Sequence, residues 1–254
     1  MRALAKRLVI GSTILIALLV CLVVAAIAMY IYITEPLQDG ARLANGDVTT
    51  VVTGHFGPVA IGVHIFALGD GTVGLIDAGN DRDAKAIRTV LARLGKRDRE
   101  VRAIFITHAH DDHTSGLAAF PEAEAYAIEP DASLVRRQRD AVSASMTKEV
   151  RDGDRLDLHG TRVEVYAVPG HTKGSAAYMV RGVLFLGDAA QGLRGGTLGA
   201  NSMLSEDAER SKRSLRMLAQ RLSSQQSDVH YIAFGHSGPL QGLEPLLKWA
   251  SSGR

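Results

Sequence analysis

The segment THAHDDH, residues 107–113, carries four potential metal ligands within six residues. In an extended segment His108 and His110 project to the same side, so both can bind one ion. Asp112 continues the same alternation, and His113 lies next to it. A single tetrahedral ion that also takes ligands from other segments cannot use all four. The segment therefore predicts a site for two metal ions.

Three further segments with potential ligands follow along the chain. Each of the four segments follows a predicted strand, an arrangement in which a rigid sheet holds ligands at an open rim. Imidazole and carboxylate suit Zn²⁺, Fe²⁺ or Mn²⁺, a carboxylate can bridge two ions, and a pair of ions can produce hydroxide at neutral pH. The segments PGHTKGS (169–175), FLGDAA (185–190) and FGHSGP (234–239) supply His171, Asp188 and His236.

The remaining four histidines lie outside these segments. Buried polar side chains are normally hydrogen-bonded, and an ordinary structural or surface role is expected for His55, His64, His159 and His230. A closed structural zinc site is an alternative for the five motif histidines, but such sites favour cysteine. The only cysteine, Cys21, lies in an apolar N-terminal run, so the rest of the chain offers no thiolate ligand and no disulfide.

Residues 8–33 form a run of 26 residues without a charged side chain. About 20 apolar residues suffice to span a bilayer core as a helix. A cleaved secretory signal is the alternative, with Ala26-Ile27-Ala28 as its cleavage site, but apolar residues continue past that point. The sequence therefore favours an uncleaved, single-pass membrane anchor through residues 8–33.

Charged residues on either side of this run predict its orientation. Arg2, Lys6 and Arg7 precede it, whereas Glu35 and Asp39 follow it. By the positive-inside rule, the N-terminus is expected in the cytoplasm and the remainder of the chain outside it. The predicted organisation is a cytoplasmic tip and anchor over residues 1–34, a polar linker over 35–46 and one globular domain over 47–254.

The globular domain is close to neutral. The chain has 29 Lys and Arg against 27 Asp and Glu, but three of the basic residues precede the anchor. An enzyme acting on nucleic acid needs a basic footprint. We therefore expect a small-molecule substrate and no nucleic-acid partner, and the sequence defines no oligomeric state.

Local patterns predict the order of helices and strands. Apolar periodicity predicts helices at 82–94, 130–142 and 240–249, and Ser205 is expected to be the N-cap of a further helix. Gly95 should end the first of these helices. Runs rich in Val, Ile and Thr, separated by turn residues, predict strands at 48–53, 59–68, 72–77, 103–106, 123–128, 155–158, 161–167, 176–180, 183–186 and 229–234.

The order of the segments LIDAG, THAHDDH, PGHTKGS, FLGDAA and FGHSGP resembles that of the metallo-β-lactamase superfamily of hydrolases. The resemblance covers residues 47–254. It implies an α+β fold, a four-layer αββα sandwich in which two β-sheets face each other and helices cover both outer faces. The expected architecture is this sandwich preceded by one N-terminal transmembrane helix.

The resemblance also implies which residues hold metal. Two Zn²⁺ per chain are expected, with iron or manganese as alternatives. The implied ligands are His108, His110 and His171 for the first ion, Asp112, His113 and His236 for the second, and Asp188 as the bridge between them.

Three further residues acquire implied roles. Asp77, in LIDAG, would support the site without binding metal, and Thr172 and Gly174 would shape the loop that presents His171. A hydroxide bridging two ions would attack the substrate. Asp112 would act as the catalytic residue, orienting that hydroxide and relaying a proton to the leaving group.

The expected activity is hydrolysis of a small ester, lactone, thioester or amide. The lack of a cysteine ligand excludes the β-lactamases that use one, and Asp188 makes the site similar to the thioesterase and lactonase branches, such as glyoxalase II. The alternatives are an iron-dependent oxygenase or redox protein on the same scaffold, and a β-lactam-hydrolysing enzyme. A non-catalytic binding module is disfavoured, because all seven ligands are present.

Overall fold

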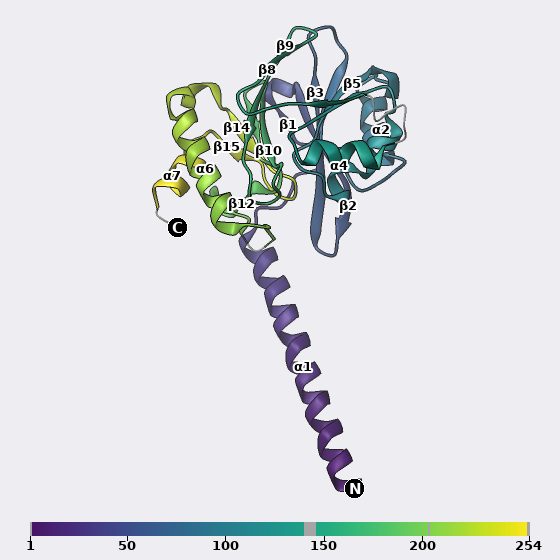
Figure 1. Cartoon of the computed structure of the whole chain (residues 1–254), viewed down its shortest axis with the longest axis vertical. Helices are drawn as coiled ribbons and strands as arrows, with labels where there is room; N and C mark the ends of the chain where they lie inside the picture. Colours follow the sequence, from purple (N-terminus) through teal and green to yellow (C-terminus); the bar gives the residue numbers. More distant parts are fainter. Residues whose placement is uncertain (1, 140–145, 203, 253–254) are drawn as a thin grey trace. The chain divides into compact units, whose positions relative to one another are not determined.

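The computed structural model describes residues 2–139, 146–202 and 204–252. The chain forms two compact units, Met1–Thr34 and Glu35–Arg254 (Figure 1). The smaller unit is one helix and the larger unit contains both β-sheets.

Helix α1 (Arg2–Ile33) makes up the first unit. Its segment Leu15–Ile33 has a mean hydropathy of 2.8 and none of it is buried, so it is long and apolar enough to cross a membrane by length and composition. At 1.5 Å per residue, these 19 residues extend about 28 Å, close to the thickness of a bilayer core. Pro36 disfavours helical conformation at Glu35, so the helix, which ends at Ile33, cannot continue past Thr34.

The first sheet of the second unit has seven strands in the order β1-β2-β3-β4-β5-β6-β7. Strands β1 to β4 pair antiparallel, and β4 to β7 pair parallel. The strands are β1 (Arg42–Leu43), β2 (Val48–Phe56), β3 (Val59–Ala67), β4 (Val73–Ile76), β5 (Val101–Phe105), β6 (Glu124–Ala127) and β7 (Thr147–Glu149).

The second sheet has six strands in the order β15-β14-β11-β10-β9-β8. All its pairings are antiparallel except that of β11 with β14. A separate hairpin consists of β12 (Ala190–Leu193) and β13 (Thr197–Ala200). The six strands are β8 (Arg155–Leu158), β9 (Thr161–Ala167), β10 (Ala176–Val180), β11 (Val183–Phe185), β14 (Tyr231–Ala233) and β15 (Leu240–Gln241).

The two sheets face each other across an aromatic core. Phe66, Phe105 and Tyr126 of the first sheet pack with Tyr178 and Phe185 of the second. The hydroxyl of Tyr178 crosses the interface and donates to the carbonyl oxygen of Ile106 at 2.9 Å. This hydrogen bond satisfies a fully buried polar group and holds the two sheets in register at the base of the metal-binding segments.

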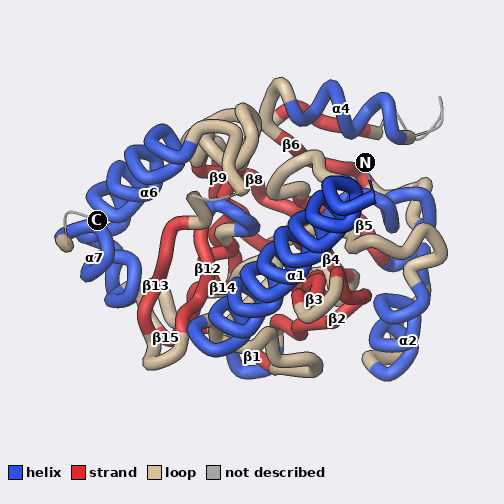
Figure 2. Tube along the Cα trace, turned by 90° about the horizontal axis from the view of Figure 1, so that it is seen from below, coloured by secondary structure: helices blue, strands red, loops and turns tan. Residues whose placement is uncertain are grey.

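Helices cover both outer faces. Apolar side chains of α2 (Lys85–Arg93) and α4 (Asp131–Gln138) pack on the first sheet, and those of α6 (Ala208–Leu222) and α7 (Glu244–Ser251) pack on the second. Figure 1 shows these helix pairs on opposite sides, and Figure 2 shows the strands between them. The predicted four-layer αββα sandwich is confirmed.

Two predicted helix starts are wrong. Ser205 is not an N-cap, because the side chain of Asp207 accepts from the N–H of Arg210 at 2.8 Å and α6 begins at Ala208. Residues 240–241 are not helical, because they pair with β14 as strand β15. Gly242 then adopts φ 66, which separates that strand from α7.

Two other helices are shorter than predicted. Ala84 has a left-handed conformation (φ 49), so α2 starts after it rather than at residue 82. Arg139 is extended, which ends α4, and residues 140–142 of the predicted helix lie outside the described residues. Gly95 ends α2 as predicted: its φ is 70, and the next N–H, of Lys96, returns to the carbonyl of Leu91 at 2.8 Å.

The segment 35–46, expected to be a linker, belongs to the globular unit. The N–H of Glu35 donates to the carbonyl of Gly192 at 3.0 Å, and Glu35 and Gln38 exchange backbone hydrogen bonds with Gly238. Leu37 packs on Gly62. The polar composition of the segment hid these contacts, because backbone pairing depends little on side-chain type.

The four histidines outside the metal-binding segments have the predicted ordinary roles. His64 is buried and hydrogen-bonded to the hydroxyl of Thr50 (3.1 Å) and the carbonyl of Phe234 (3.3 Å). At the surface, His159 contacts Asp70 at 3.1 Å, and His55 and His230 are exposed.

Acid should destabilise the domain through His64. Burial lowers the pKa of His64 to about 4, although the Phe234 carbonyl and the Asp77 carboxylate oppose this shift. As pH falls from about 6.5 to 4, the unfolded chain takes up a proton that the native chain does not, so the free energy of unfolding falls by about 3 kcal/mol. In His64→Gln this contribution should vanish. Urea unfolding followed by the fluorescence of Trp249, at pH 7 and 4.5, measures it; an equal pH dependence in both proteins would refute the assignment.

Candidate metal centre

The seven predicted ligands meet at one end of the two sheets. His108 and His110 follow β5, and helix α3 (Asp111–Thr114) carries Asp112 and His113. His171 follows β9, Asp188 lies in the 3₁₀ turn after β11, and His236 follows β14. All seven ligands therefore lie on loops, turns or the short helix α3 that follow the carboxyl ends of strands, so buried strands position the segments that carry them.

Three imidazole nitrogens converge in the first cluster. His108 Nε2 and His110 Nδ1 lie 2.9 Å apart, and His171 Nε2 lies 3.2 Å from each. Nitrogens bound to a tetrahedral ion at about 2.0–2.1 Å are separated by about 3.3 Å. The spacing of the three nitrogens is therefore that of one face of a tetrahedral metal site.

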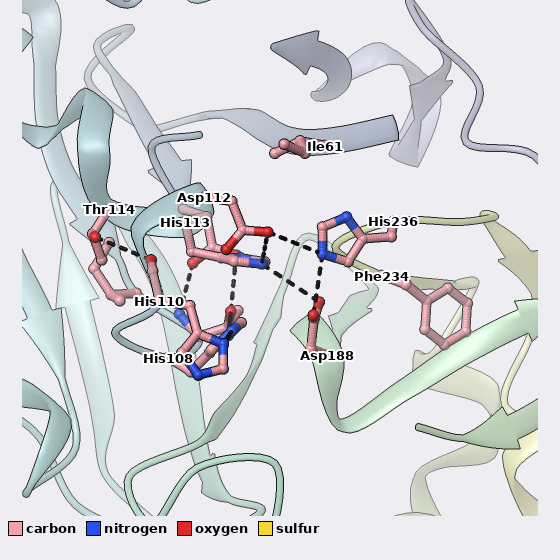
Figure 3. A network of polar contacts seen from close by, with 12 residues as sticks. Ile61, His108, His110, Asp112, His113, Thr114, Asp188, Phe234 and His236 are labelled. Atoms are coloured by element: carbon pink, nitrogen blue, oxygen red, sulfur yellow. Dashed lines mark hydrogen bonds and ion pairs between the residues drawn. The ribbon is translucent and has the colours of Figure 1, made fainter. Parts of the chain in front are cut away.

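A second cluster adjoins the first (Figure 3). His236 Nε2 lies 3.4 Å from Asp112 Oδ2, and His113 Nε2 lies 3.8 Å from the same oxygen. Asp112, His113 and His236 thus form a second group that could hold an ion.

The carboxylate of Asp188 reaches both clusters. Its Oδ2 lies 3.1 Å from His236 Nε2 and 3.8 Å from His171 Nε2, while its Oδ1 lies 3.5 Å from His113 Nε2. Asp188 also groups with His108 and His113. One carboxylate is therefore placed between the two sets of ligands.

The electrostatics suit bound cations. Burial lowers the pKa of His108 well below its usual value and that of His171 to about 4, so both rings are neutral at pH 7 with lone pairs available. Burial opposes ionisation of Asp188, but His236 and His113 beside it hold the pKa of its carboxyl well below the usual range. Burial would also lower the pKa of His113, but the Asp77 and Asp188 carboxylates outweigh it and raise that pKa to about 9, which shows that these carboxylates favour a positive charge beside them.

Several buried atoms of the ligand residues form no hydrogen bond. They are His113 Nε2, His171 Nδ1 and Asp188 Oδ1. A buried polar atom without a partner costs about 1–3 kcal/mol. For His113 Nε2 and Asp188 Oδ1, which face the clusters, a cation would relieve that cost. The set of imidazole and carboxylate donors fits Zn²⁺, Fe²⁺ or Mn²⁺.

Asp77 lies behind the second cluster. Its carboxylate accepts hydrogen bonds from the N–H and the hydroxyl of Thr107, both at 2.8 Å, and lies 2.8 Å from His113 Nδ1. The contact with Nδ1 leaves Nε2 of His113 directed toward Asp112 and Asp188. Asp77 therefore orients His113 from behind and holds the backbone just before His108.

Two residues that the sequence patterns did not single out also shape the site. Asp131 is buried and hydrogen-bonded to both the THAHDDH and PGHTKGS segments. Gly235 lies directly behind the ligands, where a Cβ would meet Asp188 Oδ1 and would approach His113 Cε1 to 2.8 Å. Neither contact could be predicted from the sequence, because each joins residues that are far apart in the chain.

Gly235→Ala should therefore weaken metal binding. The backbone of Gly235 is not left-handed, so only the new methyl group matters, and it would displace Asp188 or His113. Disturbing the surroundings of a metal ligand typically costs about 10–100-fold in affinity. Competition with a chromophoric chelator measures the change. Gly192→Ala, whose methyl would meet Phe234 and Leu240 instead, is the control; equal affinities in the two variants would contradict the prediction.

An αββα sandwich with two adjacent His/Asp clusters beyond the ends of its strands is the architecture of a metallo-hydrolase. The chain belongs to the metallo-beta-lactamase superfamily, whose sequence profile matches residues 63–236.

Curated relatives match over part of their length. The hydroxyacylglutathione hydrolase of Aeromonas hydrophila is 39% identical over 99 residues, which are 39% of this chain and 37% of that enzyme. The enzyme of the same name from Vibrio cholerae is 34% identical over 127 residues, 48% of each chain. The matched segments thus span less than half of these relatives.

Solved structures share the fold. A metallo-beta-lactamase family protein from Thermus thermophilus has a TM-score of 0.61 at 22% identity, over 81% of this chain and 78% of that one. A B3 metallo-beta-lactamase with an active-site glutamic acid has a TM-score of 0.61 at 17% identity, over 89% and 91%. A flavo di-iron protein mutant from Thermotoga maritima has a TM-score of 0.62 at 16% identity, over 85% and 62%. At these identities the likeness establishes the fold alone.

Proposed function

We propose that this superfamily member is a dinuclear metal-dependent hydrolase of small acyl compounds, with thioesters as the favoured substrate class over esters, lactones and amides. The observation that carries the proposal is the position of Asp188, whose two oxygens approach ligands of both clusters at 3.1–3.8 Å. The names of the partly matching relatives, hydroxyacylglutathione hydrolases, support the thioester class.

In this proposal the two clusters hold two ions. His108, His110 and His171 would hold one ion, and Asp112, His113 and His236 would hold the other, while Asp188 lies between the two sets of ligands. We propose zinc for both, with iron or manganese as alternatives. When bound, such ions acidify water and polarise a substrate carbonyl oxygen.

The protein side chains orient the reacting groups. Asp112 is about one-third exposed at the rim, and its Oδ2 faces His236 and His113 at 3.4 and 3.8 Å. A carboxylate there can take a proton from an attacking water and later give that proton to the leaving group. Asp77 and Thr107 are buried behind the site and hold His113 and His108 in place.

A substrate panel tests the proposal. The full chain in detergent, loaded with Zn²⁺, is assayed on a hydroxyacyl thioester of glutathione, a simple acyl thioester, an acyl homoserine lactone, an aryl ester and a β-lactam. We expect thioester hydrolysis that a chelator abolishes and added Zn²⁺ restores. Hydrolysis of the β-lactam alone would favour the lactamase alternative. Iron-dependent O₂ consumption without hydrolysis would contradict the proposal.

We also propose that α1 spans a membrane once, with the N-terminus in the cytoplasm and residues 35–254 outside. The apolar length of Leu15–Ile33 and the basic residues before it support this. A reporter enzyme that is active only outside the cytoplasm, fused after Arg254, should be active. The same reporter fused after Arg7 should be inactive. Because the fusion after Arg7 lacks Leu15–Ile33, it serves as the cytoplasmic control, and an inactive reporter after Arg254 would overturn the topology.

A further inference from the structure

Asp131 is a buried carboxylate near the metal centre that belongs to neither cluster. It is the first residue of α4 and is 2% exposed. Its Oδ2 accepts from the N–H of Ala109 and from the hydroxyl of Thr172, both at 2.8 Å, and its Oδ1 accepts from the N–H of Gly174 at 3.1 Å. Three donors therefore converge on one carboxylate, which stabilises its charge in the interior.

These donors come from the two segments that supply the first cluster. Ala109 lies between His108 and His110, and Thr172 directly follows His171. Asp131 thus joins the backbone N–H of Ala109, 22 residues before it, to the side-chain hydroxyl of Thr172, 41 residues after it. Because the carboxylate is rigid, these bonds set the distance between the backbones that carry the three converging imidazoles.

The fit around Asp131 leaves little freedom. A Cβ on Gly174 would lie 2.7 Å from the carboxyl carbon of Asp131, so the glycine permits the close approach. The hydroxyls of Thr172 and Ser175 lie 2.8 Å apart, and the N–H of Thr172 donates to Ser175 Oγ at 2.9 Å. Since Thr172 donates its hydroxyl proton to Asp131, Ser175 is the donor to Thr172. The loop that carries His171 is consequently tied to Asp131 by a closed hydrogen-bond network.

We propose that Asp131 is a positioning residue that sets the spacing of His108, His110 and His171, and through it the affinity of that cluster for its metal ion. This inference rests on the proposed function, because it requires the three imidazoles to bind an ion. Asp131 acts from behind the ligands and touches neither metal nor substrate. The second cluster depends instead on Asp77 for the orientation of His113, so loss of Asp131 should affect one ion much more than the other.

Stepwise metal titration tests the inference. The metal-free full chain in detergent is titrated with Zn²⁺ in competition with a chromophoric chelator. The competition yields one binding constant for each of the two Zn²⁺ ions. The temperature is chosen so that thermal melts show each variant to be folded. In Asp131→Asn and Asp131→Ala we expect one equivalent to bind about 10–100-fold more weakly, with the other changed much less. Asp152→Asn, which removes a carboxylate that accepts from the N–H of Ala167 away from the clusters, is the control and should keep both constants.

Thr172→Val separates positioning from general stability. This near-isosteric change removes one of the three donors and leaves the carboxylate in place, so it should weaken the same equivalent to a smaller extent. In the double variant with Asp131→Asn, the two losses should be less than additive, because both changes break one hydrogen bond. Thr172→Val also keeps the test available if the Asp131 variants do not fold.

Two results would overturn the inference. If both Zn²⁺ ions bound to the Asp131 variants with the same constants as to the wild-type chain, Asp131 would have no part in metal binding. Equal weakening of both equivalents would show a general structural role in place of a positioning one. A wild-type chain that binds no Zn²⁺ would contradict the proposed function itself, and the titration of the unaltered chain reveals this before any variant is made.

Discussion

Asp112→Ala is expected to reduce hydrolysis by about a thousandfold or more while the fold persists. Acid–base groups contribute about 10²–10⁴-fold to rates, and Asp112 would also be lost as a metal ligand. Its side chain is 36% exposed, so its removal should change the free energy of unfolding by only about 0.5 kcal/mol. Turnover of the best substrate of the panel, together with a thermal melt, measures both effects.

The adjacent aspartate provides a matched control. Asp111 is exposed, and its carboxylate accepts from Gln138 Nε2 at 3.3 Å rather than facing the clusters. Asp111→Ala should therefore retain most of the activity. If the Asp111 and Asp112 variants were equally active, the role proposed for Asp112 would be wrong.

Asp188→Asn is expected to lower the metal content from two ions per chain to about one and to abolish most hydrolysis. The amide preserves the shape of the side chain but lacks the charge that Asp188 places 3.1 Å from His236 and 3.5 Å from His113. A metal supplies several kcal/mol of transition-state stabilisation, and each 1.36 kcal/mol is tenfold, so the loss should be at least about a thousandfold. Elemental analysis after dialysis and the turnover number measure the two effects.

Asp70→Asn is the control for Asp188→Asn, because Asp70 is a turn aspartate bonded to Thr72 and lies apart from the seven ligands. It should keep two ions and full activity. An Asp188→Asn protein with two ions and unchanged turnover would show that Asp188 does not join the two clusters.

These two predictions concern residues that the sequence alone singled out. The spacing of THAHDDH and the order of the later segments identified seven potential ligands, and the structure brings all seven together. This was possible because each ligand lies in a segment that comes soon after a strand, in a loop, a turn or helix α3. The alternation of side chains in a strand and the residue at which the strand ends can both be predicted from neighbouring residues. The carboxyl ends of adjacent parallel strands lie at the same edge of a sheet.

Other predictions failed where non-local contacts decide. Ser205 and Asp207 are both good N-caps in isolation. The N–H groups of Glu206 and Asp207 donate to the carbonyls of His171 and Gly170, at 3.1 and 2.9 Å, and this contact fixes where the chain turns into α6. Leu240 likewise joins β15 because β14 is available to pair with it.

Short patterns and side-chain chemistry were enough to single out seven potential ligands, their order and the apolar character of the N-terminal helix, and the resemblance of the segments to a known superfamily predicted the layered fold. The folded chain was needed to show that Asp188 lies between two clusters, that Gly235 leaves room for it and that Asp131 ties the two ligand segments together. Each of these facts is a contact between residues far apart in the chain. Such contacts arise when two sheets pack face to face, and no local pattern records them.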